Sequence, residues 1–440
     1  MVIGLLTNEY PTEPFFAGGL ASYLQRLAEG LVKRGHSVEV FVSAAENEHY
    51  EVNGVRVNRV LVTDTWGRSI AGRPLLWRTE GVASTLQRAW MFERAVRARS
   101  TDRAFDIIQV PDYLAPGMML ALRGRVPVVT RISHYGPLWD VAYGREATIA
   151  RRQLHAAERH QMGCSCAVYG PSTFLAERVA RVTGIDVKVV PPPYDTADTV
   201  SIASKGHVPP ELEGISYALF FGTIGLLKGA DRIVEVLPEV LKACPDMTFV
   251  FAGEMSRSAD GRTFADLVAT DLREFHPRVR VLPALRHESL WPIVARSRFV
   301  VLPSRFDNLP NACLEAMALA RPVIASMHAS FDEMIEAGIS GQLVPQGSVE
   351  ALATAMIQFW RMPASELDRL GCAARAALER LAPERTFPPL ESLYQRVIRQ
   401  HHDKRCPRHR REAIDWAREL ARLASNPGVS DDGAGSTSRA

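Results

Sequence analysis

The segment FVVLPSRFDNLPNACLEAMA, residues 299–318, carries the pattern of one complete strand, loop and helix. It starts with an uninterrupted apolar run at 299–302, crosses a polar loop that contains two prolines, and continues into good helix formers. A short apolar run bounded by turn residues is typical of a strand buried on both faces of a parallel sheet. We therefore expect an α/β unit here.

The same alternation of apolar runs and helical patterns extends to both sides of this segment. A helix is expected at 20–33, because apolar residues recur there at helical spacing and a glycine follows. The expected strands are residues 2–6, 37–42, 105–110, 126–132, 217–221, 247–251, 279–282, 299–302 and 323–325. Strands that alternate with helices predict parallel sheets covered by helices. The predicted fold class is α/β, with two Rossmann-like, doubly wound domains.

The length of the chain and one break in the pattern predict the domain boundaries. A chain of 440 residues exceeds what one hydrophobic core usually supports. The alternation breaks in a polar run with several prolines, which we interpret as a linker. The predicted division is a domain at 1–194, a linker at 195–214, a domain at 215–388, a helix at 389–402 that packs back on the N-terminal domain, and a basic helix with a disordered tail at 403–440.

Composition narrows the class of protein. Hydrophobic residues make up 47% of the chain, charged residues 23%, and the net charge is +3, so we expect no nucleic-acid partner. The first residues lack a basic leader and a cleavage site, and no apolar run has the length of a membrane span. The sparse cysteines lack the spacing of a metal site and are expected to be free thiols. We predict a cytoplasmic protein whose membrane contact, if any, is peripheral at the inner face.

The start of the helix within 299–318 has the features of an anion-binding site. Asn308 is the expected helix cap, and Pro310 suits the first turn, where no amide hydrogen is needed. The unpaired amides of Leu309, Asn311 and Ala312 would then favour an anion such as a diphosphate.

Two carboxylates flank that helix start. Asp307 precedes it and Glu315 lies on its second turn, so they are placed to accept hydrogen bonds from different hydroxyl groups of a bound sugar nucleotide. Taken alone, the pair also fits a capped helix with two solvated carboxylates.

Residues 303–326 resemble the signature of glycosyltransferase family 4, whose members are retaining enzymes with the GT-B architecture. That signature has two acidic residues separated by seven others, and Asp307 and Glu315 occupy the two places. Asp307 stands where glutamate is commoner. The resemblance implies two domains with an interdomain cleft, an acceptor-side N-terminal domain, a nucleotide diphosphate sugar as the donor substrate, no cofactor and no metal.

The segment 222–229 is similar to the loop that opens the second domain in this family. Lys228 stands at the place of a lysine that binds the diphosphate, whereas Thr223 stands where the family typically has an arginine. A cation at that place offsets the charge that develops on the departing diphosphate. Arg305 and Arg131 are candidates for the missing cation.

Four glycines resemble the family's close contacts with the donor. Gly18 and Gly19 follow the first strand, and the resemblance implies that their amides close over the diphosphate. Gly222 opens the second domain's loop, and Gly253 ends one of its strands. Each would let the backbone approach a ligand closely.

The segment 128–136 resembles the strand and loop where the family often places a histidine near the two sugars. We choose His134 for this role, although Ser133 could take the same place. A loop histidine without a function is the alternative.

The resemblance implies a retaining hexosyl transfer to a hydroxyl of a glycan, lipid or small molecule. The predicted catalytic residues are His134, Asp307 and Lys228. The predicted donor-binding residues are Gly18, Gly19, Gly222, Lys228, Gly253, Asp307, Asn308, Leu309, Asn311 and Glu315. The alternatives are a nucleotide-sugar epimerase, a phosphorylase, or a catalytically silent binding protein. Trp66, Trp77 and Trp90 could face an acceptor sugar, but we favour a packing role.

Overall fold

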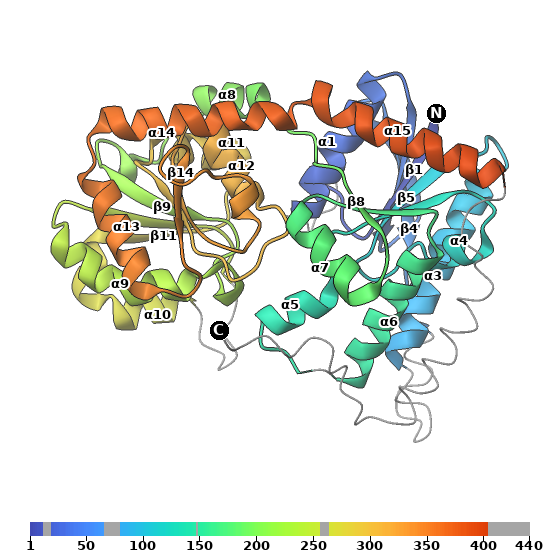
Figure 1. The fold of residues 1–440 in the computed structure, drawn as a ribbon, viewed down its shortest axis with the longest axis horizontal. Coiled ribbons are helices and arrows are strands. Elements are labelled where there is room, and N and C mark those ends of the chain that lie inside the picture. Colours follow the sequence, from blue (N-terminus) through green and yellow to red (C-terminus); the bar gives the residue numbers. More distant parts are fainter. Residues whose placement is uncertain (12–18, 66–79, 147, 256–263, 404–440) are drawn as a thin grey trace. The chain divides into compact units, whose positions relative to one another are not determined.

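The computed structural model describes residues 1–11, 19–65, 80–146, 148–255 and 264–403 (Figure 1). It divides into two compact units. The first unit comprises Met1–Pro193 and the C-terminal segment from Glu384, and the second comprises Tyr194–Pro383. Each unit has its own sheet and its own core. Among the described residues, no helix combines the length and the apolar character needed to cross a membrane.

The first unit is built on a sheet of eight strands in the order β3-β4-β2-β1-β5-β6-β7-β8. All neighbours are parallel except β3 and β4, which are antiparallel. The strands are β1 (Val2–Thr7), β2 (Ser37–Ala44), β3 (Glu48–Val52), β4 (Val55–Leu61), β5 (Ile107–Pro111), β6 (Val128–Arg131), β7 (Ala167–Gly170) and β8 (Val187–Val189). The helices include α1 (Gly19–Lys33), α3 (Glu80–Arg99), α4 (Met118–Arg123), α5 (Gly136–Ala142), α6 (Ile149–Cys164), α7 (Thr173–Thr183) and α15 (Pro383–His402).

Alternate residues of β1 pack on opposite faces of this sheet. Ile3 and Leu5 belong to the core that includes α1, whereas Val2 and Leu6 belong to the core that includes α3. The helix predicted at 20–33 is confirmed as α1, and it ends before Gly35, which has a φ of +83°. A backbone angle of this kind is readily adopted only by glycine, which explains the stop.

The C-terminal helix α15 packs on the first unit beside α1, as Figure 1 shows. Phe387 and Tyr394 are buried in the same core as α1, and the Tyr394 hydroxyl donates to Gln109 of β5. An ion pair between Arg34, the residue after α1, and Glu391 of α15 lies at the surface, with 2.7 Å between Nε and Oε1. The helix begins at Pro383, which is earlier than the predicted start at 389.

The second unit has a sheet of six parallel strands in the order β11-β10-β9-β12-β13-β14. Its strands are β9 (Tyr217–Phe221), β10 (Thr248–Ala252), β11 (Val279–Leu282), β12 (Val300–Leu302), β13 (Val323–Ser326) and β14 (Gly341–Val344). Its helices include α8 (Thr196–Lys205), α9 (Ala230–Ala243), α10 (Phe264–Asp271), α11 (His287–Arg296), α12 (Asn311–Ala318), α13 (Val349–Arg361) and α14 (Ala364–Ala377). The five strands predicted for this half are all present.

The prediction of a linker at 195–214 is wrong. Most of its first half forms α8, capped by the side chain of Asp195, and this helix packs on α11. Thr199 of α8 is buried and bonded to the hydroxyl of Tyr194 at 3.0 Å. The prolines and polar residues therefore belong to a helix and its flanks on the second unit, which starts at Tyr194.

Candidate functional site

Two glycine turns lie against each other at the carboxyl edge of the second unit's sheet. Gly222 follows β9 with a φ of +114°, and Gly253 follows β10 with a φ of +152°. A Cβ atom on Gly253 would lie 1.8 Å from the carbonyl oxygen of Gly222, so no other residue fits there. The adjacent amide of Ile224 donates to the Glu254 carbonyl at 2.8 Å. Both predicted glycines thus form one turn pair.

The loop after β9 is also tied to the loop after β12. A Cβ atom on Gly229, whose φ is +74°, would meet the Pro303 carbonyl oxygen at 2.0 Å. The amide of Arg305 donates to the Leu227 carbonyl at 2.8 Å. This close approach of two loops is what brings the side chains of the two predicted motifs together.

Lys228 and Asp307, which are far apart in the sequence, form an ion pair at this edge. The ammonium group of Lys228 donates to Oδ2 of Asp307, and the other oxygen accepts the amide of Asn308 at 3.0 Å. The Asp307 side chain is 8% exposed, whereas that of Lys228 is 26% exposed. The Lys228 side chain is therefore partly accessible to solvent, whereas the Asp307 carboxylate is nearly buried and accepts from both Lys228 and the Asn308 amide.

The structure places both candidates for the missing cation in other interactions. Arg305 pairs with Asp231 through two nitrogens, at 2.7 and 2.5 Å, and these hydrogen bonds raise the pKa of the guanidinium. Arg131 lies in the first unit, where it stacks over the Tyr23 ring at 3.7 Å and donates to Ser133 at 3.0 Å.

The helix start differs from the prediction in its cap. Helix α12 begins at Asn311, and Pro310 takes the cap position, so Asn308 is a buried loop residue and not the cap. The reason is that Asp307 already bonds the Asn308 amide and holds that residue in the loop. Within the described residues, the amides of Leu309 and Ala312 donate to no protein acceptor, whereas Asn311, the third residue of the predicted anion site, takes part in a further interaction. The anion site therefore stays a prediction.

Glu315 lies on α12 and is buried, with 8% of its side chain exposed. Its Oε1 atom is 3.7 Å from Nε2 of His287, the first residue of α11. The His287 ring stacks on Trp291 one turn later, with centroids 4.3 Å apart. Sequence reasoning missed His287, because only packing of α11 beside α12 brings it to the carboxylate.

In the first unit, His134 follows β6 and lies in a row of aromatic rings. Its ring centroid is 4.8 Å from that of Tyr113 and 4.5 Å from that of Trp139. Burial lowers the pKa of His134 to about 4. The ring is therefore neutral near pH 7, where it can form hydrogen bonds but is not a cationic acid.

Two buried carboxyl groups that were not predicted as site residues support this row of rings. Asp112 accepts the amides of Ser133, His134 and Tyr135 at 2.6, 3.2 and 2.7 Å. Glu158 of α6 accepts the Leu114 amide at 2.9 Å. Burial raises the pKa of both groups, and for Glu158 the charge of Asp112 adds to the effect. Their role is to hold the loops after β5 and β6.

Three predicted features fall wholly or partly outside the described residues. Gly18, Trp66 and Trp77 lie there, as does most of the predicted tail from 403. Gly19 is the exposed first residue of α1. Trp90 is half-buried under Arg94, whose guanidinium lies 4.8 Å from the ring centroid, in agreement with a packing role.

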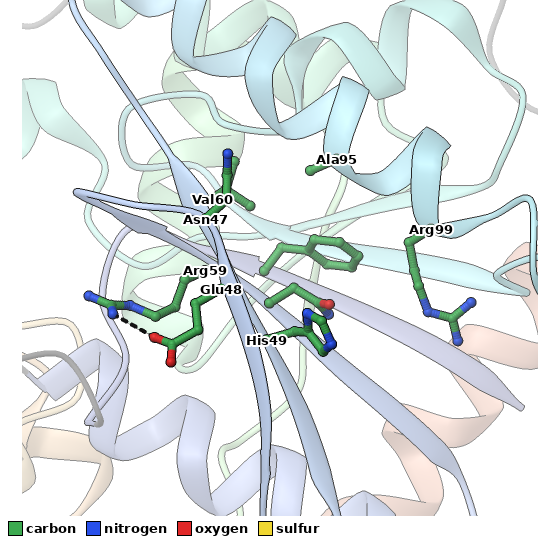
Figure 2. A pocket seen from close by; sticks show the side chains of 9 residues that line it. Asn47, Glu48, His49, Arg59, Val60, Ala95 and Arg99 are labelled. Carbon is green, nitrogen blue, oxygen red and sulfur yellow. Dashed lines mark hydrogen bonds and ion pairs between the residues drawn. The ribbon is translucent and has the colours of Figure 1, made fainter.

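A hollow of about 220 Å³ lies elsewhere on the first unit, between β2, β3, β4 and α3 (Figure 2). Its arginines are already paired: Arg59 with Glu48 at 2.9 Å, and Arg99 with Glu39 at 2.6 Å. None of the predicted site residues lines it. Across the ranges that the structure describes, no three His, Cys, Asp or Glu side chains are grouped as metal ligands.

Comparison with known proteins identifies the class from the fold. The sucrose-phosphate synthase of Thermosynechococcus elongatus is similar with a TM-score of 0.71 and 18% identity, over 90% of this chain and 98% of that protein. The Anabaena protein HepE in complex with UDP is similar with a TM-score of 0.63 and 15% identity, over 90% of this chain and 100% of that protein. The fold is GT-B, as predicted.

Sequence comparison then gives the family. Residues 17–198 match the sequence profile of Glycosyltransferase Family 4, and residues 216–362 match that of Glycosyl transferases group 1. An uncharacterized glycosyltransferase of Methanocaldococcus jannaschii is 27% identical over 370 residues, which cover 80% of this chain and 87% of that protein. The chain belongs to the family 4, group 1 glycosyltransferases.

Proposed function

We propose that this chain transfers a hexosyl group from a nucleotide diphosphate sugar to an acceptor hydroxyl with retention of anomeric configuration. The bond from the anomeric carbon to the diphosphate oxygen breaks, and a bond to the acceptor oxygen forms on the same face. The acceptor proton passes to the departing diphosphate. The acceptor is a hydroxyl of a glycan, a lipid or a small molecule.

The observation that carries the proposal is the Lys228–Asp307 pair at the carboxyl edge of the second unit's sheet. Ligands of open parallel sheets bind beyond the carboxyl ends of the strands. The diphosphate would bind the exposed side of Lys228 and the amides at the start of α12, whose positive end favours an anion. These groups offset the charge of the leaving group, which supports a reaction that needs no metal or other cofactor.

The other predicted residues take supporting roles in this proposal. Glu315 would accept hydrogen bonds from the ribose, and Asp307 from the sugar once Lys228 turns to the phosphate. Gly222 and Gly253 would let the backbone come close to the nucleotide. In the first unit, the neutral His134 would donate to or accept from a sugar hydroxyl. We propose the cytoplasm as the location, which the free thiols of Cys164, Cys244 and Cys313 support.

Calorimetric titration with UDP, GDP, ADP and dTDP tests this assignment. We expect one of the four to bind the wild type, and Lys228→Ala to weaken that binding about 10- to 100-fold through loss of a charged hydrogen bond. The matched control is Lys205→Ala, which removes an exposed lysine at the end of α8. Equal binding by the two variants would refute the diphosphate site.

Product analysis separates the proposal from its alternatives. A transferase gives the free nucleotide diphosphate and a glycosylated acceptor. Isomerised donor without an acceptor would indicate an epimerase, and dependence on inorganic phosphate would indicate a phosphorylase. Binding of the donor with neither hydrolysis nor transfer would mean a silent binding protein.

A further inference from the structure

We propose that Arg131 positions the loop that carries His134, and that a network of buried hydrogen bonds from the C-terminal helix α15 holds Arg131 in place. This inference rests on the proposed function, which assigns a sugar contact to His134. Arg131 is thus a positioning residue and not a catalytic one. We call the side chains that link α15 to it the tyrosine network, and they are Tyr394, Gln109, Tyr169 and Tyr23.

The guanidinium of Arg131 makes two contacts at once. Its Cζ atom lies 3.7 Å from the centroid of the Tyr23 ring, and Nη1 donates to the Ser133 hydroxyl at 3.0 Å. The side chain is buried. A planar cation can stack with its face while it donates with its edge, whereas the ammonium group of a lysine cannot. Arg131 therefore fixes the Ser133 side chain relative to α1, the helix that carries Tyr23.

Ser133 leads directly into His134. The Ser133 amide donates to Asp112 at 2.6 Å, and the His134 amide donates to the same oxygen at 3.2 Å. The side chain of Ser133 is thus held by Arg131 and its backbone by Asp112. Because Ser133 immediately precedes His134, a shift of Arg131 should move the histidine ring out of its aromatic row.

The tyrosine network fixes the ring on which Arg131 stacks. The side-chain oxygen of Gln109 accepts from Tyr394 and, at 2.5 Å, from Tyr169. Since Tyr169 gives its only hydroxyl hydrogen to Gln109, its oxygen accepts from the Tyr23 hydroxyl, which is 3.1 Å away. Tyr23 is therefore held at the far end of its ring, and the ring cannot swing away without loss of this bond.

The network joins four elements that are distant in the sequence. Tyr23 lies on α1, Gln109 on β5, Tyr169 on β7 and Tyr394 on α15. The three tyrosines belong to one core on the α1 face of the sheet, and each of the four side chains is at most 5% exposed. Burial raises the pKa of Tyr169 and Tyr394, so their hydroxyl groups stay protonated and can donate.

The polar character of this core favours a positioning role. Buried hydroxyl groups cost free energy unless they are bonded, and apolar side chains of similar shape can replace a bonded pair with little loss. A fully bonded network adds one defined arrangement of its members. The buried Tyr217 of the second unit donates only to a backbone carbonyl, that of Ile293, at 2.7 Å. The tyrosine network ends instead on Arg131 and the loop of His134.

Titration of the His134 ring by NMR tests the proposal without a ligand. Burial lowers its pKa to about 4, so its isotope-labelled signal, identified with His134→Gln, should stay constant between pH 7 and pH 5 in the wild type. Arg131→Lys keeps the charge but loses the planar contact. The loop should then loosen and admit water, and the pKa should rise toward 6.5. The groups whose charges act on the ring, Asp140, His155 and Arg145, are unchanged in this variant.

Tyr394→Phe tests the far end of the tyrosine network. It removes one hydroxyl group and no charge. The pKa of His134 should rise in the same direction as in Arg131→Lys. The rise should be smaller, because Gln109 still accepts from Tyr169. This variant decides the outcome if Arg131→Lys does not fold.

Two matched controls lie in the second unit. Tyr217→Phe removes an equally buried hydroxyl group. Arg298→Lys removes a guanidinium that lies 5.1 Å from the centroid of the Trp360 ring and donates to two backbone carbonyls. Both controls should lower the midpoint of urea unfolding much as the test variants do, because they lose similar contacts. They should leave the titration of His134 as in the wild type.

Nucleotide binding separates this inference from the proposed function. Calorimetry with UDP, GDP, ADP and dTDP should give the same affinity for Arg131→Lys as for the wild type, since the donor-site residues belong to the second unit. A wild type that binds none of the four would refute the proposed donor site, while the titration of His134 would still decide the role of Arg131. The proposal is overturned if His134 titrates as in the wild type in Arg131→Lys or in Tyr394→Phe, or if the two controls raise its pKa equally.

Discussion

The carboxyl edges of the two sheets present charge in opposite ways. In the second unit charged groups pair with one another, Lys228 with Asp307 and Arg305 with Asp231, and His287 lies beside the Glu315 carboxylate. In the first unit, burial shifts the pKa values of His134 and Glu158 in the directions that favour their neutral forms. A charged edge suits a diphosphate, whereas a neutral aromatic edge suits hydroxyl groups. The comparison indicates that two similar parallel sheets can suit different ligands because the loops after their strands carry different side chains.

Substitution within the Gly222–Gly253 turn pair of the second unit should have the largest effect on stability. Gly253→Ala forces a Cβ atom into the Gly222 carbonyl and should destabilise the second unit by about 3 kcal/mol or more. Nucleotide binding should be lost with it. Urea unfolding with calorimetry measures both effects.

The control for that variant is Gly338→Ala in the same unit. Gly338 has a φ of +78°, but no atom lies within 4 Å of its Cβ position, so only the backbone angle is penalised. We expect a cost of about 1 kcal/mol. Equal costs at Gly253 and Gly338 would show that the two turns are not in close contact.

The neutral His134 of the first unit predicts a pH dependence of stability. Its pKa falls from 6.5 to about 4 on folding, so between these values the unfolded chain binds the additional proton. Its stabilising contribution is therefore complete above pH 6.5 and is lost as the pH falls to about 4, by about 3 kcal/mol in all.

His134→Gln should remove that share of the pH dependence. The measurement is the unfolding free energy at pH 7 and pH 4.5 in both proteins. His155 also has a pKa lowered by burial, so the wild type alone is not diagnostic and the difference between the proteins is needed. An unchanged difference between the two pH values would mean that the ring is solvated.

The smallest expected effect concerns the half-exposed His287 beside Glu315 in the second unit. His287 is 43% exposed and its nitrogen is 3.7 Å from Glu315, so His287→Ala should change nucleotide affinity by no more than about five-fold. Calorimetry with the nucleotide that binds the wild type measures this. A loss as large as that of Lys228→Ala would make His287 a direct ligand.

Local sequence patterns were sufficient to predict most of the helices and strands. The apolar run at 299–302 became β12, and α1 ended at the predicted glycine. The linker prediction at 195–214 was wrong because prolines and polar residues occur both in linkers and in or beside surface helices. Here only the contact of α8 with α11 distinguishes the two cases. Asn308 was assigned the cap, since its residue type fits, but the Asp307 side chain holds its amide in the loop.

By itself, the sequence determined the α/β alternation and the family resemblance. It also singled out Asp307, Glu315 and Lys228 as candidate site residues. These features depend on neighbours along the chain or on a short motif. Only the tertiary structure decided that Lys228 pairs with Asp307 and that His287 reaches Glu315. These contacts depend on which loops and helices meet at the carboxyl edge of the sheet, and the positions of the residues along the sequence do not predict that.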